Sequence, residues 1–208
     1  MPRFNIQQLN NYSHLFKRQV RVSDLNYNSH LDHSNILKIV HDARAEYFRE
    51  LGFSEKNLLP KSNKLVHGIV GDLQAQYLNE GELFEELLIE TDFIERSRCG
   101  FRITHRIKSL KPFGSLDQFN NKNNNNSNSN NNKPNGINYN NSNIGINKPI
   151  GENSNEQNAA GTTFKNIALI EVGNVAISTI DHQPFELPDS FFKTVGLNKN
   201  FQITKIKL

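Results

Sequence analysis

The stretch RVSDLNYNSHLDHSNILKIVHDARAEYFRELG, residues 21–52, joins a polar segment to a long amphipathic one. The polar segment carries hydrogen-bonding side chains at alternate positions, namely Asp24, Asn26, Asn28, His30 and Asp32. The amphipathic segment has apolar residues at steps of three and four, the spacing of one helix face, at Ile36, Leu37, Val40, Ala43, Tyr47, Phe48 and Leu51. The stretch therefore predicts a helix over residues 35–51, with Asp32 or Ser34 as N-cap and Gly52 as the C-terminal cap.

The apolar face of this helix is wider than a surface helix needs, so another layer has to cover it. Four later segments have the partial alternation and the β-branched and aromatic residues of strands, over residues 64–78, 82–95, 100–110 and 164–180. Residues 14–22 predict a strand before the helix, and residues 184–192 an irregular segment with a short helix. Short links at residues 79–81 and 98–100 predict an antiparallel meander. The predicted fold class is α+β, with an antiparallel sheet curled around one long central helix.

The region from residue 115 to residue 161 has a different composition, rich in asparagine and poor in apolar residues. Such a segment cannot bury enough apolar surface to offset its ordering entropy, so we expect it to be disordered. Loop-closure entropy grows slowly with length, which favours a tolerated insertion in a surface loop. We therefore predict a single domain over residues 14–196, interrupted by this insertion, with tails at 1–13 and 197–208.

Composition excludes several classes of partner and site. The chain has 24 Lys and Arg against 21 Asp and Glu, a net charge of +3, but the basic residues are scattered, so no nucleic-acid-binding surface is expected. Cys99 is the single cysteine, which excludes an intramolecular disulfide and a cysteine-based zinc site and suits a reducing compartment. The histidines are not spaced with carboxylates as metal ligands are, so no metal site is expected.

The chain also lacks the signals of a membrane protein. Its apolar runs are too short to span a bilayer, and its first residues lack the apolar core of a secretory signal. We therefore expect a soluble cytoplasmic protein with no membrane partner. No acidic residue precedes Asp24, as in transit peptides, so import into mitochondria is the alternative.

The run from Val20 to Leu37, with its Asp-x-Asn-x-Asn-x-His core, and the following HDARAEYFRELG at 41–52 resemble the hotdog-fold acyl-CoA thioesterases of the 4-hydroxybenzoyl-CoA thioesterase type. The similarity extends through residues 68–90, 100–107 and 166–181. It implies a hotdog fold and hydrolysis of an acyl-CoA thioester in a cleft between the subunits of a homodimer or homotetramer. Coenzyme A would be part of the substrate, and no separate cofactor is implied.

The resemblance also implies a site at the helix start, where an acidic side chain acts as nucleophile or general base and backbone N–H groups hold the thioester carbonyl. A helix N-terminus offers unpaired N–H donors and a partial positive charge, which suit a developing oxyanion. The sequence departs from the family at Asn26, which stands where the commonest members carry the catalytic Asp. An amide is not basic, so Asn26 can only orient water or the substrate.

Asn28 and His30 match the Asn and His of the plant acyl-carrier-protein thioesterases. His30 is therefore predicted to be the general base or polariser, because imidazole titrates near neutral pH, with Asn26 and Asn28 positioning the reactants. Asp24 is the nearest carboxylate that could orient or replace the missing base. Asp42, within the predicted helix, is a second candidate base.

Three alternatives stay open. Turns and helix caps select Asp and Asn on their own, so these residues could be purely structural. A hotdog enoyl-CoA hydratase would use Asp24, Asn26 and His30, but Tyr27 replaces its proline and His30 lies one residue too far along. A non-catalytic acyl-thioester-binding dimer would explain the missing acid. Whether the substrate carries coenzyme A or a carrier protein, and which acyl chain, is left open.

Overall fold

The computed structural model describes residue 6 and residues 8–110, 156–157 and 163–197. The elements in chain order are β1 (His14–Gln19), the short 3-10 helix η1 (Val22–Asp24), α1 (His33–Glu50), β2 (Val66–Tyr77), β3 (Glu86–Ser97), β4 (Gly100–Ser109), β5 (Glu156–Gln157), β6 (Thr163–Ser178) and α3 (Asp189–Thr194).

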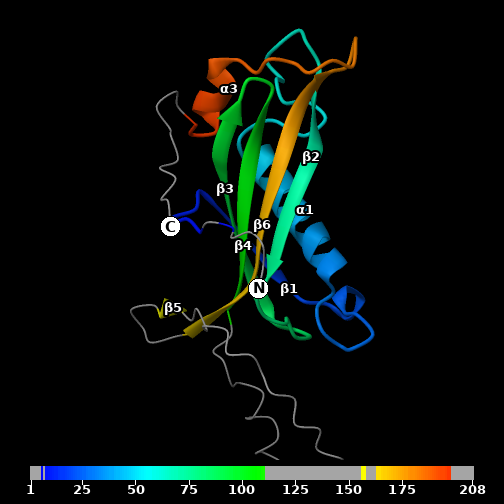
Figure 1. Cartoon of the computed structure of the whole chain (residues 1–208), viewed down its shortest axis with the longest axis vertical. Helices are drawn as coiled ribbons and strands as arrows, with labels where there is room; N and C mark the ends of the chain where they lie inside the picture. Colours follow the sequence, from blue (N-terminus) through cyan, green and yellow to red (C-terminus); the bar gives the residue numbers. More distant parts are fainter. Residues whose placement is uncertain (1–5, 7, 111–155, 158–162, 198–208) are drawn as a thin grey trace, which may run out of the picture.

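The strands form one antiparallel sheet in the order β1-β3-β4-β6-β2, with β5 paired to β6. The long helix α1 packs along one face of this sheet, and α3 lies at the end where β3 meets β4 (Figure 1). The predicted α+β hotdog fold, with a sheet wrapped around one long helix, is confirmed.

Helix α1 forms where the apolar periodicity places it, with small differences at its ends. It starts at His33, two residues earlier than predicted, because the Asp32 side chain caps it by accepting the Ser34 N–H at 2.8 Å. It ends at Glu50, and Gly52 follows at φ +84, a left-handed conformation that ends helices at low cost when the residue is glycine. The predicted N-cap Asp32 is confirmed, whereas the C-cap is Leu51 and Gly52 is the left-handed residue directly after it.

The strand order corrects the predicted meander. The link at 98–100 does form a hairpin between β3 and β4, but the link at 79–81 does not join neighbouring strands. Instead β2 pairs with β6 from Val66 to Tyr77, and the chain then crosses the sheet to reach β3 at the other side. The crossing is held by backbone bonds, from the Leu31 N–H to the Gly81 carbonyl (2.9 Å) and from the Val20 N–H to the Glu85 carbonyl (2.9 Å).

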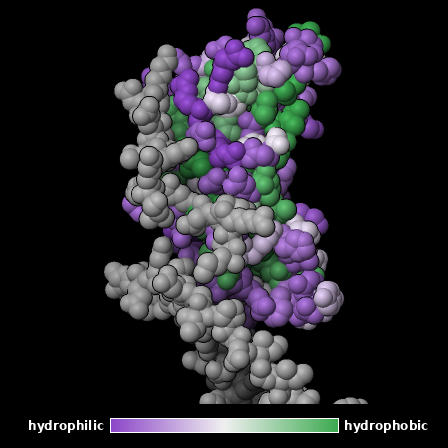
Figure 2. Space-filling view, in the orientation of Figure 1, coloured by the Kyte–Doolittle hydropathy of each residue, from purple (hydrophilic) through white to green (hydrophobic). Residues whose placement is uncertain are grey.

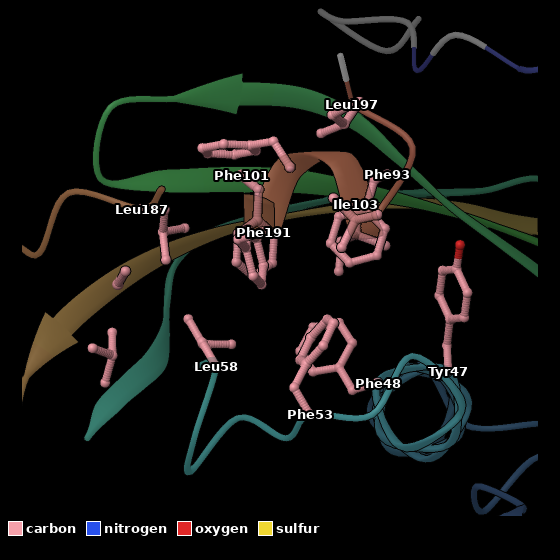
Figure 3. Packing of buried hydrophobic residues seen from close by; sticks show 14 residues of the cluster. Tyr47, Phe48, Phe53, Leu58, Phe93, Phe101, Ile103, Leu187, Phe191 and Leu197 are labelled. Atoms are coloured by element: carbon pink, nitrogen blue, oxygen red, sulfur yellow. The ribbon is translucent and has the colours of Figure 1, made fainter. Parts of the chain in front are cut away.

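The core between α1 and the sheet is largely aromatic at the C-terminal end of the helix. Phe48 is 1% exposed, and its ring centroid lies 4.9 Å from that of Phe53 and 5.9 Å from that of Phe93. Figure 3 shows Phe53 and Leu58, from the loop after α1, pointing toward Phe191 of α3. Burial of several large rings against one helix is the main favourable term for this layer.

Part of the predicted domain organisation stays untested. The asparagine-rich insertion predicted at 115–161 lies outside the described residues, except for β5. The domain limits 14–196 and the tails remain predictions. Among the described residues, neither α-helix combines the length and the hydropathy that a membrane crossing requires.

One titratable group is enclosed within this core. His105 on β4 is fully buried, and its Nδ1 lies 2.9 Å from the hydroxyl of Thr91 on β3. Burial lowers the pKa of His105 to about 3, and the positive charges of Arg44 and His14 act in the same direction. The imidazole is therefore neutral in the folded protein at every pH near neutrality.

This burial predicts a pH dependence of stability. The unfolded chain binds a proton at His105 below about pH 6.5, whereas the folded chain does not until about pH 3. The free energy of unfolding should therefore fall as the pH falls through this window, by up to about 1.4 kcal/mol per pH unit from this group. Urea unfolding between pH 4.5 and 7 should give a shallower slope for His105→Gln than for the native chain. An exposed control, His33→Gln, should keep the native slope, and equal slopes in all three proteins would contradict this assignment.

Candidate active site

The polar segment before α1 folds into a tight turn around Asn26. Its Oδ1 accepts the N–H groups of Asn28 (2.9 Å) and His30 (3.2 Å), and its own N–H donates to the His30 carbonyl at 2.8 Å. Ser29 completes the turn at φ 64, a conformation that only a minority of non-glycine residues adopt. Asn28 is exposed and His30 is half-buried. The Asn26 amide thus fixes the backbone that carries His30.

The crossing segment between β2 and β3 supplies a carboxylate to His30. Glu80 Oε2 lies 3.6 Å from His30 Nδ1, an ion-pair distance that is longer than a hydrogen bond. The next residue, Gly81, approaches the chain so closely that a Cβ on it would lie 2.9 Å from the Leu31 Cβ. Glu80 was not predicted as a site residue, because it lies in the short link at 79–81 that predicts a turn between neighbouring strands. The pairing of β2 with β6, which sequence alone did not give, brings Glu80 to the helix start.

The backbone donors at the start of α1 are partly taken by the protein itself. Asp32 accepts both the hydroxyl and the N–H of Ser34, and these two hydrogen bonds, the hydroxyl first, lower the pKa of Asp32. The Ser34 N–H therefore already donates to Asp32. Fewer backbone N–H groups at the start of α1 are left to bind a thioester carbonyl. A hydroxyl also lies near the first residue of α1. The Tyr77 hydroxyl at the end of β2 donates a hydrogen bond to the His33 carbonyl oxygen at 3.4 Å, so this donor too is engaged with the protein's own backbone.

Tyr77 is suited to donate a hydrogen bond. Burial and, to a smaller extent, the charge of Asp32 raise the pKa of Tyr77, so its hydroxyl keeps its proton at neutral pH. Its ring meets that of His33 edge-on, with centroids 6.2 Å apart. His30 and Glu80 therefore lie together just before α1, and Tyr77 contacts His33, the first residue of the helix.

The other two predicted acids lie in a separate hollow between β1 and α1. The Asp24 side chain is 7% exposed and accepts from Nη2 of Arg18 through both oxygens, at 2.8 and 3.0 Å. The Asp42 side chain is 57% exposed and accepts from Nη1 of the same guanidinium at 3.3 Å. The hollow is about 550 Å³ and is also lined by Leu37, Lys38 and His41. The candidate residues thus divide into two groups: Asp24 with Asp42, and Asn26 and Asn28 with His30.

Asp24 also stabilises the fold of the polar segment. Its side chain accepts the Arg21 N–H at 2.9 Å, and its carbonyl accepts the Asp32 N–H at 2.9 Å. Both ends of the polar segment are thereby tied together at one buried residue. In the described part of the chain, no three His, Cys, Asp or Glu side chains converge as metal ligands do.

Comparison with known proteins finds a family model that matches about half of the chain. Residues 20–122 match the family model described as the thioesterase-like superfamily. No curated protein matches the sequence. Among solved structures, a 1,4-dihydroxy-2-naphthoyl-CoA thioesterase from Synechocystis superposes with a TM-score of 0.56 at 10% identity, covering 88% of this chain and 95% of that chain.

Two further structures agree. A 4-hydroxybenzoyl-CoA thioesterase, solved as an Asp-to-Asn variant in complex with 4-hydroxybenzoyl-CoA, has a TM-score of 0.57 at 11% identity over 87% of this chain and 96% of that chain. A probable thioesterase from Bartonella henselae has a TM-score of 0.52 at 14% identity over 84% and 98%. At such low identities these likenesses establish the hotdog fold alone.

The two carboxylates on Arg18 allow a matched test of stability. Asp24→Asn leaves the partly buried guanidinium without its closest countercharge, and the cost of about 3–5 kcal/mol for breaking a fully buried ion pair is the upper limit of the expected loss. Asp42→Asn removes the exposed partner of the same guanidinium and should cost less than about 1 kcal/mol. Urea unfolding at pH 7 measures both. Similar losses in the two variants would show that Asp24 is not the anchor of the polar segment.

Proposed function

We propose that this chain, whose domain belongs to the thioesterase-like superfamily, hydrolyses acyl-CoA or acyl-carrier thioesters to a free acid and a thiol. The observation that carries the proposal is the pairing of His30 with Glu80 at the start of α1. It supplies a base and a carboxylate where Asn26 supplies neither. We place the protein in the cytoplasm, a compartment that suits its single free cysteine, Cys99.

His30 is the general base in this proposal. It takes a proton from a water molecule as the water oxygen attacks the thioester carbonyl carbon, and Glu80 stabilises the imidazolium that forms. The carbonyl electron pair moves to the oxygen, and the Tyr77 hydroxyl would stabilise that oxygen if it exchanged its hydrogen bond to the His33 carbonyl for one to the substrate. When the tetrahedral intermediate collapses, the C–S bond breaks and the imidazolium returns the proton to the leaving thiolate. Asn26 positions His30, Asn28 faces the incoming substrate, and Asp24 and Asp42 stay with Arg18.

The acting form is proposed to be a homodimer joined through β2. This strand of 12 residues pairs only with β6 in the described residues, so its other edge offers unpaired backbone groups. Its exposed residues include the polar Asp72 and Gln74 and four large apolar ones, Ile69, Val70, Leu73 and Tyr77. Figure 2 shows apolar surface on the side of the molecule where β2 lies. Pairing with a second copy would cover this edge and bring the partner's strand beside Tyr77 and the start of α1.

The hydrolysis is tested by thiol release from a panel of acyl-CoAs. His30→Ala should lower kcat/KM by about 10²–10⁴-fold, the contribution of a general base, and Glu80→Gln by about tenfold or more. His182→Asn changes an exposed histidine outside this site and keeps a residue suited to its φ of 57, so it should retain native activity. Full activity in His30→Ala would contradict the assignment. A native protein that binds acyl-CoA without releasing thiol would support the non-catalytic alternative instead.

The dimer is tested by charge at the free edge. Ile69→Lys places an ammonium group on the exposed edge of β2 and should convert the protein to a monomer, because a paired edge would have to bury that charge. Ile180→Lys, at an 84% exposed site outside β2, should leave the dimer intact. Sedimentation velocity measures the two masses. A native chain that sediments as a monomer would contradict the proposed dimer through β2.

A further inference from the structure

A second hollow lies at the opposite end of α1 from His30. The helix has 18 residues and is therefore about 27 Å long, so the two places are well separated. The hollow is about 540 Å³ and lies between the loop that follows α1 and the segment around α3. Its floor is apolar and is made mainly by Phe53, Leu58, Leu59, Pro60, Phe185 and Phe191. Figure 3 shows the buried side of this floor, where Phe53 and Leu58 point toward Phe191, and the ring centroids of Phe53 and Phe191 are 5.2 Å apart.

The polar side of the hollow is positively charged. Lys61 and Lys64 both line it, and neither forms an ion pair in the part of the chain that the structure describes. Lys64 Nζ lies 5.3 Å from the centroid of the Phe185 ring, which places its charge against the apolar wall. Glu186 is the one carboxylate in the lining. The hollow thus combines a long apolar floor with two cations and a single anion.

We propose that this hollow binds the anion of an aliphatic carboxylic acid. Its chain lies against Leu59, Pro60 and Phe185, the apolar lining residues that keep exposed surface, and its carboxylate meets Lys61 and Lys64. The volume lies within the range of about 300–1,000 Å³ that small-molecule sites occupy, and such sites are mainly apolar with a few charged groups that fix orientation. Both lysines are exposed, so a neutral lipid would gain nothing from them, whereas a carboxylate would gain charge-assisted hydrogen bonds.

The proposed hydrolysis would release such an acid, so the hollow would be a second place where the product binds. That source of the ligand rests on the proposed function, whereas the binding itself does not. Binding is therefore measured directly, with dodecanoate as the probe and 1-dodecanol as its uncharged counterpart. Isothermal titration of the full-length protein gives the affinity and the number of sites for each.

Three variants locate the binding. Lys61→Gln with Lys64→Gln removes the two charges and should weaken dodecanoate binding at least tenfold while leaving dodecanol binding unchanged, which also shows that the hollow remains folded. Leu59→Trp fills the hollow and should weaken both ligands. His30→Ala should leave dodecanoate binding at this site intact, whatever it does to hydrolysis.

Each outcome either supports or overturns the proposed binding of the acid in this hollow. Dodecanoate that binds more tightly than dodecanol, with the losses just described, supports the proposal even if no thioester is hydrolysed. Equal binding of the two ligands, or dodecanoate binding that survives both the lysine and the Leu59→Trp changes, overturns it. Binding lost only in His30→Ala would place the acid at the helix start and overturns it as well.

Discussion

The contact of Gly81 with Leu31 is the constraint on which the site depends. The segment leaving β2 has to pass under the start of α1 to reach β3, and the Leu31 N–H binds the Gly81 carbonyl at 2.9 Å as it passes. A side chain at Gly81 would collide with Leu31, so the crossing is possible at this depth only without one. Strand β2 ends with Tyr77 in contact with the first residue of α1, and the crossing then brings Glu80 to His30. A sheet built as a simple meander would leave His30 without Glu80.

Local periodicity predicted most of the elements. The apolar spacing from Ile36 to Leu51 located α1 to within two residues, and Asp32 and Gly52 fixed its ends, because capping is decided by neighbours in sequence. The order of the strands was not predictable in the same way. Pairing of β2 with β6 joins segments about a hundred residues apart, on the two sides of the asparagine-rich region, and nothing in the short link at 79–81 signals it.

The contrast between local patterns and long-range strand pairing also explains which candidate site residues could be predicted from the sequence. His30 and Asn26 stood out because they share one turn, and the structure places the Asn26 amide under the His30 backbone. Glu80 stood out in no local pattern, since its role comes from the crossing. Asp24 was predicted as the carboxylate that could orient or replace the base; it lies buried against Arg18 and binds the Arg21 N–H, and its part in the chemistry stays a prediction. The two ends of α1 differ in kind: polar side chains converge at its start, and aromatic rings and two lysines at its end.

The most direct test of the central claim is whether His30 and Glu80 act as one unit. A double-mutant cycle compares kcat/KM for acyl-CoA hydrolysis in the native protein, His30→Ala, Glu80→Gln and the double variant. If Glu80 acts through His30, Glu80→Gln should change the rate of the His30→Ala protein by less than about twofold, although it costs about tenfold or more in the native background. The same fractional loss in both backgrounds would mean that the two residues work independently, and the account would fail.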